Sequence, residues 1–206
     1  MKINKIIHFI LLTLYLIIAS SKSYSNNHNN NLENVYEHLR NKQFTEAINK
    51  LKVLSEKNKS EAQLLYAKIL YSGEITTQDF EMSYFWSNTS KLGGLIKSSN
   101  IIDKLNDLID EENKSKINEK IKIFLNKSAL SGQRLAIVQI AKWNIELSPE
   151  PNFENAYKWY NIAVALGIKT AKIKRDEMIK NIEKQRLFEI QKESIKIFNK
   201  INNLGG

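Results

Sequence analysis

The chain of 206 residues matches itself when it is shifted by 73 or 74 positions. Residues 80–86 lie over residues 153–159, and the two stretches share Phe, Glu, Tyr and Trp at matching positions. Gly94 lies over Gly167 in the same register. Two copies of one unit predict a repeat architecture, in which neighbouring copies stack and bury faces that one copy cannot bury alone.

Apolar residues recur at helical spacing from Leu32 onward, and no run of alternating apolar and polar residues indicates a strand. The chain has only two prolines, Pro149 and Pro151, so long helices are permitted almost everywhere. The spacing predicts ten helices, over residues 32–40, 44–57, 61–72, 79–92, 95–112, 114–131, 133–147, 153–166, 168–182 and 185–202.

Glycines and short polar loops separate these helices, which favours antiparallel neighbours. We therefore predict an all-α fold, an α-solenoid of stacked antiparallel helical hairpins, as one domain over residues 32–206. Its N-terminal hairpin covers residues 32–57, and the two repeat units cover residues 61–131 and 133–203.

The repeated segments carry the motifs of a known family. These are Leu70-Tyr71-Ser72-Gly73, Asp79, Trp86 and Gly93 in the first copy, and Ala156, Trp159-Tyr160, Ala163, Ala165 and Gly167 in the second. The pattern resembles the Sel-one-like repeat, a longer relative of the tetratricopeptide repeat, over residues 41–94 and 135–175. The resemblance implies an adaptor in protein complexes, including those of bacterial envelopes. The chain departs from the pattern at residues 145–148, which replace the expected Tyr-x-x-Gly, and it lacks the Cys pairs of some secreted members.

The first segment, residues 1–25, has the order of a secretory signal. Lys2 and Lys5 precede an apolar stretch over residues 6–19, and polar residues follow. The apolar stretch of about 14 residues is shorter than the ~20 that span a bilayer as a helix. The pattern predicts export to a bacterial periplasm or secretion.

Small residues mark a cleavage position after this stretch. Ser23 and Ser25 fit the −3 and −1 sites, which predicts cleavage before Asn26 and leaves a polar linker over residues 26–31. Ala19 and Ser21 are a second option for the same two sites. In the alternative, the segment stays uncleaved and anchors the chain in the inner membrane through residues 6–19.

The net charge of +9 includes three lysines of the signal. The remaining chain has 28 basic against 22 acidic side chains, a net charge of +6, and no block of like charge. Together with export, this distribution argues against nucleic acid as a partner. The absence of Cys excludes disulfides, thiolate metal sites and thiol nucleophiles.

The sequence contains few candidates for catalytic, metal-binding or phosphate-binding residues. The three histidines, His8, His28 and His38, form no metal-binding pair, and no glycine-rich phosphate loop occurs. We therefore predict no catalytic, cofactor-binding or metal residues, no cofactor, and no enzymatic activity. Acidic clusters at residues 110–112 and 176–177 leave one alternative, an envelope enzyme or enzyme subunit that acts on a glycan. That alternative requires two carboxylates facing each other at roughly 5–10 Å.

Equivalent positions in the two copies fall into two kinds. Trp86 and Trp159 occupy equivalent positions, which predicts a packing role in each copy. Phe85 and Lys158 are equivalent in position but differ in chemistry, so we expect them to be exposed and to contact a partner. The sequence thus predicts an exported, non-enzymatic scaffold for a protein or peptide partner, with membrane contact only through an uncleaved N-terminal segment.

Overall fold

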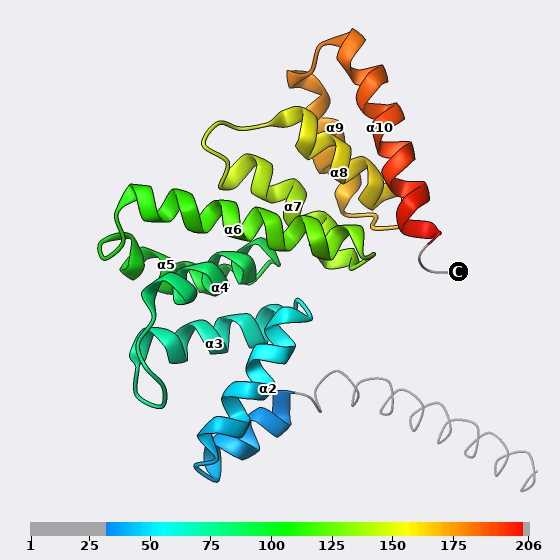
Figure 1. Ribbon diagram of the computed structural model, residues 1–206. Coiled ribbons are helices and arrows are strands. Elements are labelled where there is room, and N and C mark those ends of the chain that lie inside the picture. Colours follow the sequence, from blue (N-terminus) through cyan, green and yellow to red (C-terminus); the bar gives the residue numbers. More distant parts are fainter. Residues whose placement is uncertain (1–31, 204–206) are drawn as a thin grey trace, which may run out of the picture. The chain divides into compact units, whose positions relative to one another are not determined.

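The computed structural model describes residues 32–203, which form helices and no strand (Figure 1). The signal predicted over residues 1–25 and the linker over residues 26–31 lie outside the described residues. Residues 32–40 are helical. The elements that follow are α2 (Phe44–Glu56), α3 (Ser60–Ser72), α4 (Phe80–Leu92), the 3-10 helix η1 (Ile96–Ser98), α5 (Ser99–Asn106), α6 (Glu111–Leu130), α7 (Arg134–Glu146), α8 (Phe153–Ala165), α9 (Ala171–Met178), the 3-10 helix η2 (Ile179–Asn181) and α10 (Lys184–Asn202). The all-α prediction is confirmed.

The chain divides into two compact units between Leu51 and Lys52, within α2. In the first unit, Val35, Ala47 and Leu51 are fully buried. This boundary falls inside the hairpin expected over residues 32–57, so a single continuous domain over residues 32–206 stays a prediction.

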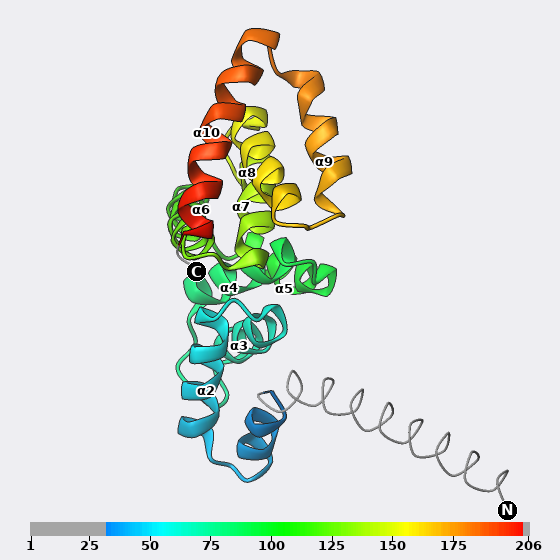
Figure 2. The ribbon, with the colours of Figure 1, turned by 90° about the vertical axis from the view of Figure 1, so that its right-hand side faces the viewer.

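The second unit is a stack of helical hairpins. Helix α3 packs against α4, α6 against α7, α7 against α8, and α8 against both α9 and α10. Figure 2 shows α8 between α9 and α10. One continuous hydrophobic cluster runs from Leu64 to Ile201, as expected when stacked repeats bury a shared core.

The two copies of the repeat close their hairpins in the same way. Gly94 and Gly167 have φ angles of 100° and 82°, in the left-handed region that a glycine adopts without steric cost. The next amide then turns back to the helix: Leu95 N donates to Ser90 O at 3.2 Å, and Ile168 N donates to Ala163 O at 2.9 Å. The repeat read from the sequence is therefore a repeat of backbone conformation.

Helices α4 and α8 also begin alike. The side chain of Asp79 accepts a hydrogen bond from Met82 N, and that of Asn152 accepts one from Asn155 N, each at 2.9 Å. Each side chain satisfies an amide that has no partner within its helix. The N-caps are 73 residues apart, in register with the closing glycines.

One predicted helix is too long. The expected helix over residues 95–112 is the short η1 followed by α5, which ends at Asn106, and the expected helix over residues 114–131 begins three residues earlier as α6. Asp110 causes the difference, because its side chain accepts a hydrogen bond from Asn113 N at 2.8 Å and starts a new helix.

The helix predicted over residues 168–182 is also shorter in the structure. Helix α9 begins at Ala171, because the left-handed Gly167 turns the chain before it, and the last turn tightens into η2.

Candidate functional site

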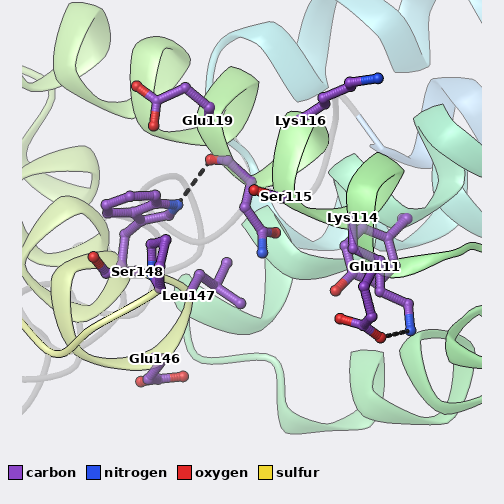
Figure 3. Close-up of a pocket in the computed structure, with 12 residues that line it drawn as sticks. Glu111, Lys114, Ser115, Lys116, Glu119, Glu146, Leu147 and Ser148 are labelled. Atoms are coloured by element: carbon purple, nitrogen blue, oxygen red, sulfur yellow. Dashed lines mark hydrogen bonds and ion pairs between the residues drawn. The ribbon is translucent and has the colours of Figure 1, made fainter.

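A pocket of about 680 Å³ opens between α4, α6, α7 and the loop that follows α7 (Figure 3). All of its residues belong to the second unit. Helix α4 contributes Tyr84, and the end of α7 and its loop contribute five residues. The α6 side chains that line it are Glu111, Lys114, Ser115, Lys116, Asn118 and Glu119. We call this pocket the α6–α7 groove.

Trp143 is the most deeply buried side chain of the groove and is 2% exposed. Its Nε1 donates to the backbone carbonyl of Asn118 on α6 at 3.0 Å. The Nζ atom of Lys122 lies 5.0 Å from the centre of the ring, a cation–π distance. These contacts fix α7 to α6 at the base of the groove and leave almost none of the indole exposed.

Burial also affects Tyr84, on the α4 side of the groove. Its ring is nearly covered by neighbouring side chains, and this burial raises the pKa of the Tyr84 hydroxyl above its ordinary value. The side chain is therefore a neutral hydroxyl at any physiological pH.

Lys114 is held inside the groove by two acceptors. Its Nζ donates to Glu111 Oε1 and to the backbone carbonyl of Asn106, both at 2.8 Å, and its side chain is 12% exposed. The hydrogen bond with Glu111 raises the pKa of Lys114, which stays protonated. Figure 3 shows this pair at one edge of the groove. The charge of Lys114 is thus used in contacts within the protein, and little of it is available to a ligand.

The other lysines near the groove are paired as well. Lys116 Nζ lies 2.6 Å from Glu112 Oε1, and Lys122 Nζ lies 3.2 Å from Glu119 Oε1. Glu146 differs: no lysine or arginine of residues 32–203 lies within 4.0 Å of its carboxylate. Within the described part of the chain, the groove therefore has one carboxylate without an ion-pair partner.

Local sequence places the α6 side of the groove. Asp110 starts the helix, and its Oδ2 also accepts a hydrogen bond from Asn113 Nδ2 at 2.9 Å. The backbone hydrogen bond from Asn113 holds the pKa of Asp110 below its ordinary value. Glu111 follows directly, at the positive end of the helix dipole. The cap therefore fixes where Glu111 and Lys114 enter the groove.

The α7 side is placed by the end of that helix. The backbone amides of Leu147 and Ser148 both donate to the carbonyl of Trp143 at 3.0 Å, which closes the last turn. Pro149 follows and has no amide hydrogen to continue a helix. The chain therefore leaves α7 along the groove, and Leu147 and Ser148 form its wall.

A second pocket of about 310 Å³ lies between α8 and α10. Its lining is mainly apolar and contains no charged residue: Asn161, Ile162, Ala165, Ser194, Ile195, Phe198 and Asn199. Such a lining gives little basis for choosing among ligands.

The expectation that Phe85 is exposed is wrong. Its side chain is 8% exposed, and its ring centre lies 4.8 Å from that of Trp86 and 5.7 Å from that of Phe124 on α6. Helix α6 covers Phe85 with the aromatic ring of Phe124. A covered ring is not available to a partner.

Lys158 is also less accessible than expected. Its side chain is 18% exposed, and its Nζ lies 3.1 Å from Glu193 Oε2 on α10. Phe85 and Lys158 do not line the α6–α7 groove, and the structure does not bring them together. Trp86 and Trp159 are buried, which confirms their predicted packing role.

The arrangement offers limited chemistry. Within residues 32–203, no group of three or more His, Asp or Glu side chains could hold a metal ion. In Figure 3 the carboxylates of Glu111, Glu119 and Glu146 lie at separate edges of the groove and do not face one another. Nor is any helix of residues 32–203 both long enough and apolar enough to cross a bilayer.

Sequence reasoning did not assign the groove residues. Trp143 could be recognised only as one aromatic residue among several on the hairpin helices, and the acidic run at residues 110–112 only as a charge cluster. The signal that could have found Glu146 is its position: it ends a helix directly before a proline-containing loop, with no basic residue in the last turn.

The chain matches no protein-family profile and no curated protein. Among solved structures, it is similar to a protective antigen present in uropathogenic Escherichia coli strains that displays an SLR (Sel-one-like repeat) fold. The match has 16% sequence identity and a TM-score of 0.38, and covers 75% of this chain and 41% of that one.

Proposed function

We propose that this chain is a non-enzymatic scaffold that binds a segment of a partner protein in the α6–α7 groove. The observation that carries the proposal is the groove itself, with Leu147, Ser148 and Pro149 on one side and an open rim of charged side chains on the other. Repeat stacks commonly bind partners on extended surfaces without chemistry. Binding of this kind needs neither a cofactor nor nucleic acid.

Site-specific photo-crosslinking in intact cells tests this proposal. A photo-reactive amino acid in place of Ser115 or Ser148 stands in the groove, and one in place of exposed Lys172 on α9 is the control. We expect one discrete protein adduct from both groove positions and none from position 172. Identical adduct patterns at all three positions, or no adduct from the groove, would overturn the proposal.

We place the scaffold in the bacterial envelope, in the periplasm or outside the cell. The support is the order of charged, apolar and small residues over residues 1–25. A fusion to an alkaline phosphatase that is active only after export should be active, and the double variant Leu11→Lys, Leu12→Lys should be inactive. N-terminal sequencing distinguishes cleavage before Asn26 from an anchor retained through residues 6–19. An active double variant would contradict export by this segment.

A further inference from the structure

The α6–α7 groove is more acidic than the rest of the chain. Three carboxylates and two amines line it, whereas the whole chain has a net charge of +9. Both amines are neutralised within the protein, Lys114 by Glu111 and Lys116 by Glu112. A ligand entering the groove therefore meets an excess of negative charge.

Glu146 is the centre of this excess. It is exposed, lines the groove and has no basic partner among residues 32–203, unlike Glu119, which is paired with Lys122. Most acidic side chains near the groove thus have their own cation, and Glu146 is free to take one from a ligand.

The end of α7 adds a second attraction for a cation at the same place. Glu146 is the last residue of this 13-residue helix, and the last turn contains no basic residue. The C-terminal end of a helix carries partial negative charge on its free carbonyls and favours a cationic side chain. In this turn the carbonyls of Trp143 and Asn144 already accept backbone amides, which leaves those of Ile145 and Glu146 to act together with the carboxylate.

The groove also has apolar surface next to Glu146. Leu147 and Pro149 supply it. The planar guanidinium of arginine suits such a place, because it can donate to a carboxylate and to carbonyls at once while its stem covers apolar surface.

We propose that the α6–α7 groove recognises a basic peptide segment of the partner, in which an arginine lies against Glu146 and the end of α7 and an apolar neighbour lies against Leu147 and Pro149. This inference rests on the proposed function, since it names the chemical class of the segment that the scaffold binds. It also assigns Glu146 as the residue that selects charge.

The probe is the blocked tripeptide acetyl-Leu-Arg-Leu-amide, with acetyl-Leu-Gln-Leu-amide as its uncharged counterpart. In ¹H–¹⁵N NMR titrations of the full chain, we expect the arginine peptide to shift the amides of residues 146–148 and the Trp143 indole N–H in a saturable way. The glutamine peptide should shift them less. Higher salt should weaken binding of the arginine peptide, because screening acts on exposed charges.

Two variants with the same change in charge make the test specific. Glu146→Gln should weaken binding of the arginine peptide about two- to fivefold, the range expected for an exposed ion pair, and should leave the glutamine peptide unaffected. Glu61→Gln, at an exposed position of α3 outside the groove, should change neither. Equal shifts from both peptides, or an unchanged affinity in Glu146→Gln, would overturn the inference.

The two proposals fail separately. If photo-crosslinking captures a partner from the groove while the arginine peptide causes no shifts there, the scaffold function stands and the basic class of segment is wrong. If the captured protein is a second copy of this chain, sedimentation will show concentration-dependent self-association, and a distinct partner segment is then excluded.

Discussion

Asn58 and Gln139, 81 residues apart, are joined by a buried hydrogen bond in which the Asn58 side-chain amide donates to Gln139 Oε1. Gln63 Nε2 donates to Asn58 Oδ1 at 2.9 Å, and Gln139 Nε2 donates to the carbonyl of Thr89 at 2.9 Å. One set of amides thus connects the turn before α3, helix α4 and helix α7. It links the first repeat to the second at a point that water does not reach.

Gln139→Leu should destabilise the second unit by about 1–3 kcal/mol, because it leaves the amide of Asn58 buried without an acceptor. Urea unfolding followed by circular dichroism measures the change. Gln185→Leu is the matched control, at an exposed position of α10, and should change stability by less than about 0.5 kcal/mol.

The double variant Asn58→Gly, Gln139→Leu, compared with the two single variants, tests the coupling between the two side chains. Asn58 has φ 59°, which glycine tolerates, and strict additivity of the two losses would mean that the side chains do not interact.

Gly93 and Gly94 are adjacent, but they resist substitution for different reasons. A Cβ at Gly93 would overlap Ser60 Oγ. A Cβ at Gly94 would meet no atom within 4 Å, but Gly94 has a φ of 100°, which residues with a side chain rarely adopt. We expect both Gly93→Ala and Gly94→Ala to lower the melting temperature. Adding Ser60→Ala should recover part of the loss in Gly93→Ala and none in Gly94→Ala. Equal recovery in both backgrounds would contradict the steric explanation.

The ion pair between Glu154 and Arg186 gives stability a dependence on pH. Arg186 Nη2 lies 2.8 Å from Glu154 Oε2, and this hydrogen bond holds the pKa of Glu154 below its ordinary value of 4.5. The pKa of Glu154 is lower in the folded protein than in the unfolded chain. The contribution of the ion pair to folding stability is therefore complete above about pH 4.5, and it is lost as the pH falls through the pKa of Glu154 in the folded protein. Arg186→Gln should raise the pKa of Glu154 toward 4.5 in a ¹³C NMR titration. Lys174→Gln, which removes a surface cation of α9, should leave it unchanged.

The repeat and the fold class could be predicted because they depend on local signals that occur twice. Gly94 and Gly167 supply left-handed turns, and Asp79 and Asn152 supply caps, each at a spacing of 73 residues. The start of α6 could not be predicted from periodicity, because apolar residues continue in helical phase up to Ile109 and a single capping residue, Asp110, ends the pattern.

The groove was harder to predict than the fold, because it depends on contacts between residues far apart in the chain. Nothing local indicates that the indole of Trp143 donates to the backbone of Asn118, or that Lys114 is held by Asn106. Burial was predictable where both copies share a residue, as for Trp86 and Trp159. It was not predictable at Phe85, because the ring that covers it comes from Phe124, which is 39 positions later.

Phe85 and Lys158 provide a final test, because they occupy equivalent positions in the two copies and are expected to contribute differently to stability. Phe85→Ala should destabilise the second unit by about 3–5 kcal/mol, since it removes a buried ring from the contact with Trp86 and Phe124. Lys158→Ala should cost at most about 1 kcal/mol, since Glu193 remains hydrated. Chemical denaturation of both variants measures the difference. A Phe85→Ala protein of unchanged stability would show that the ring is not packed, and would restore Phe85 as a possible contact for a partner.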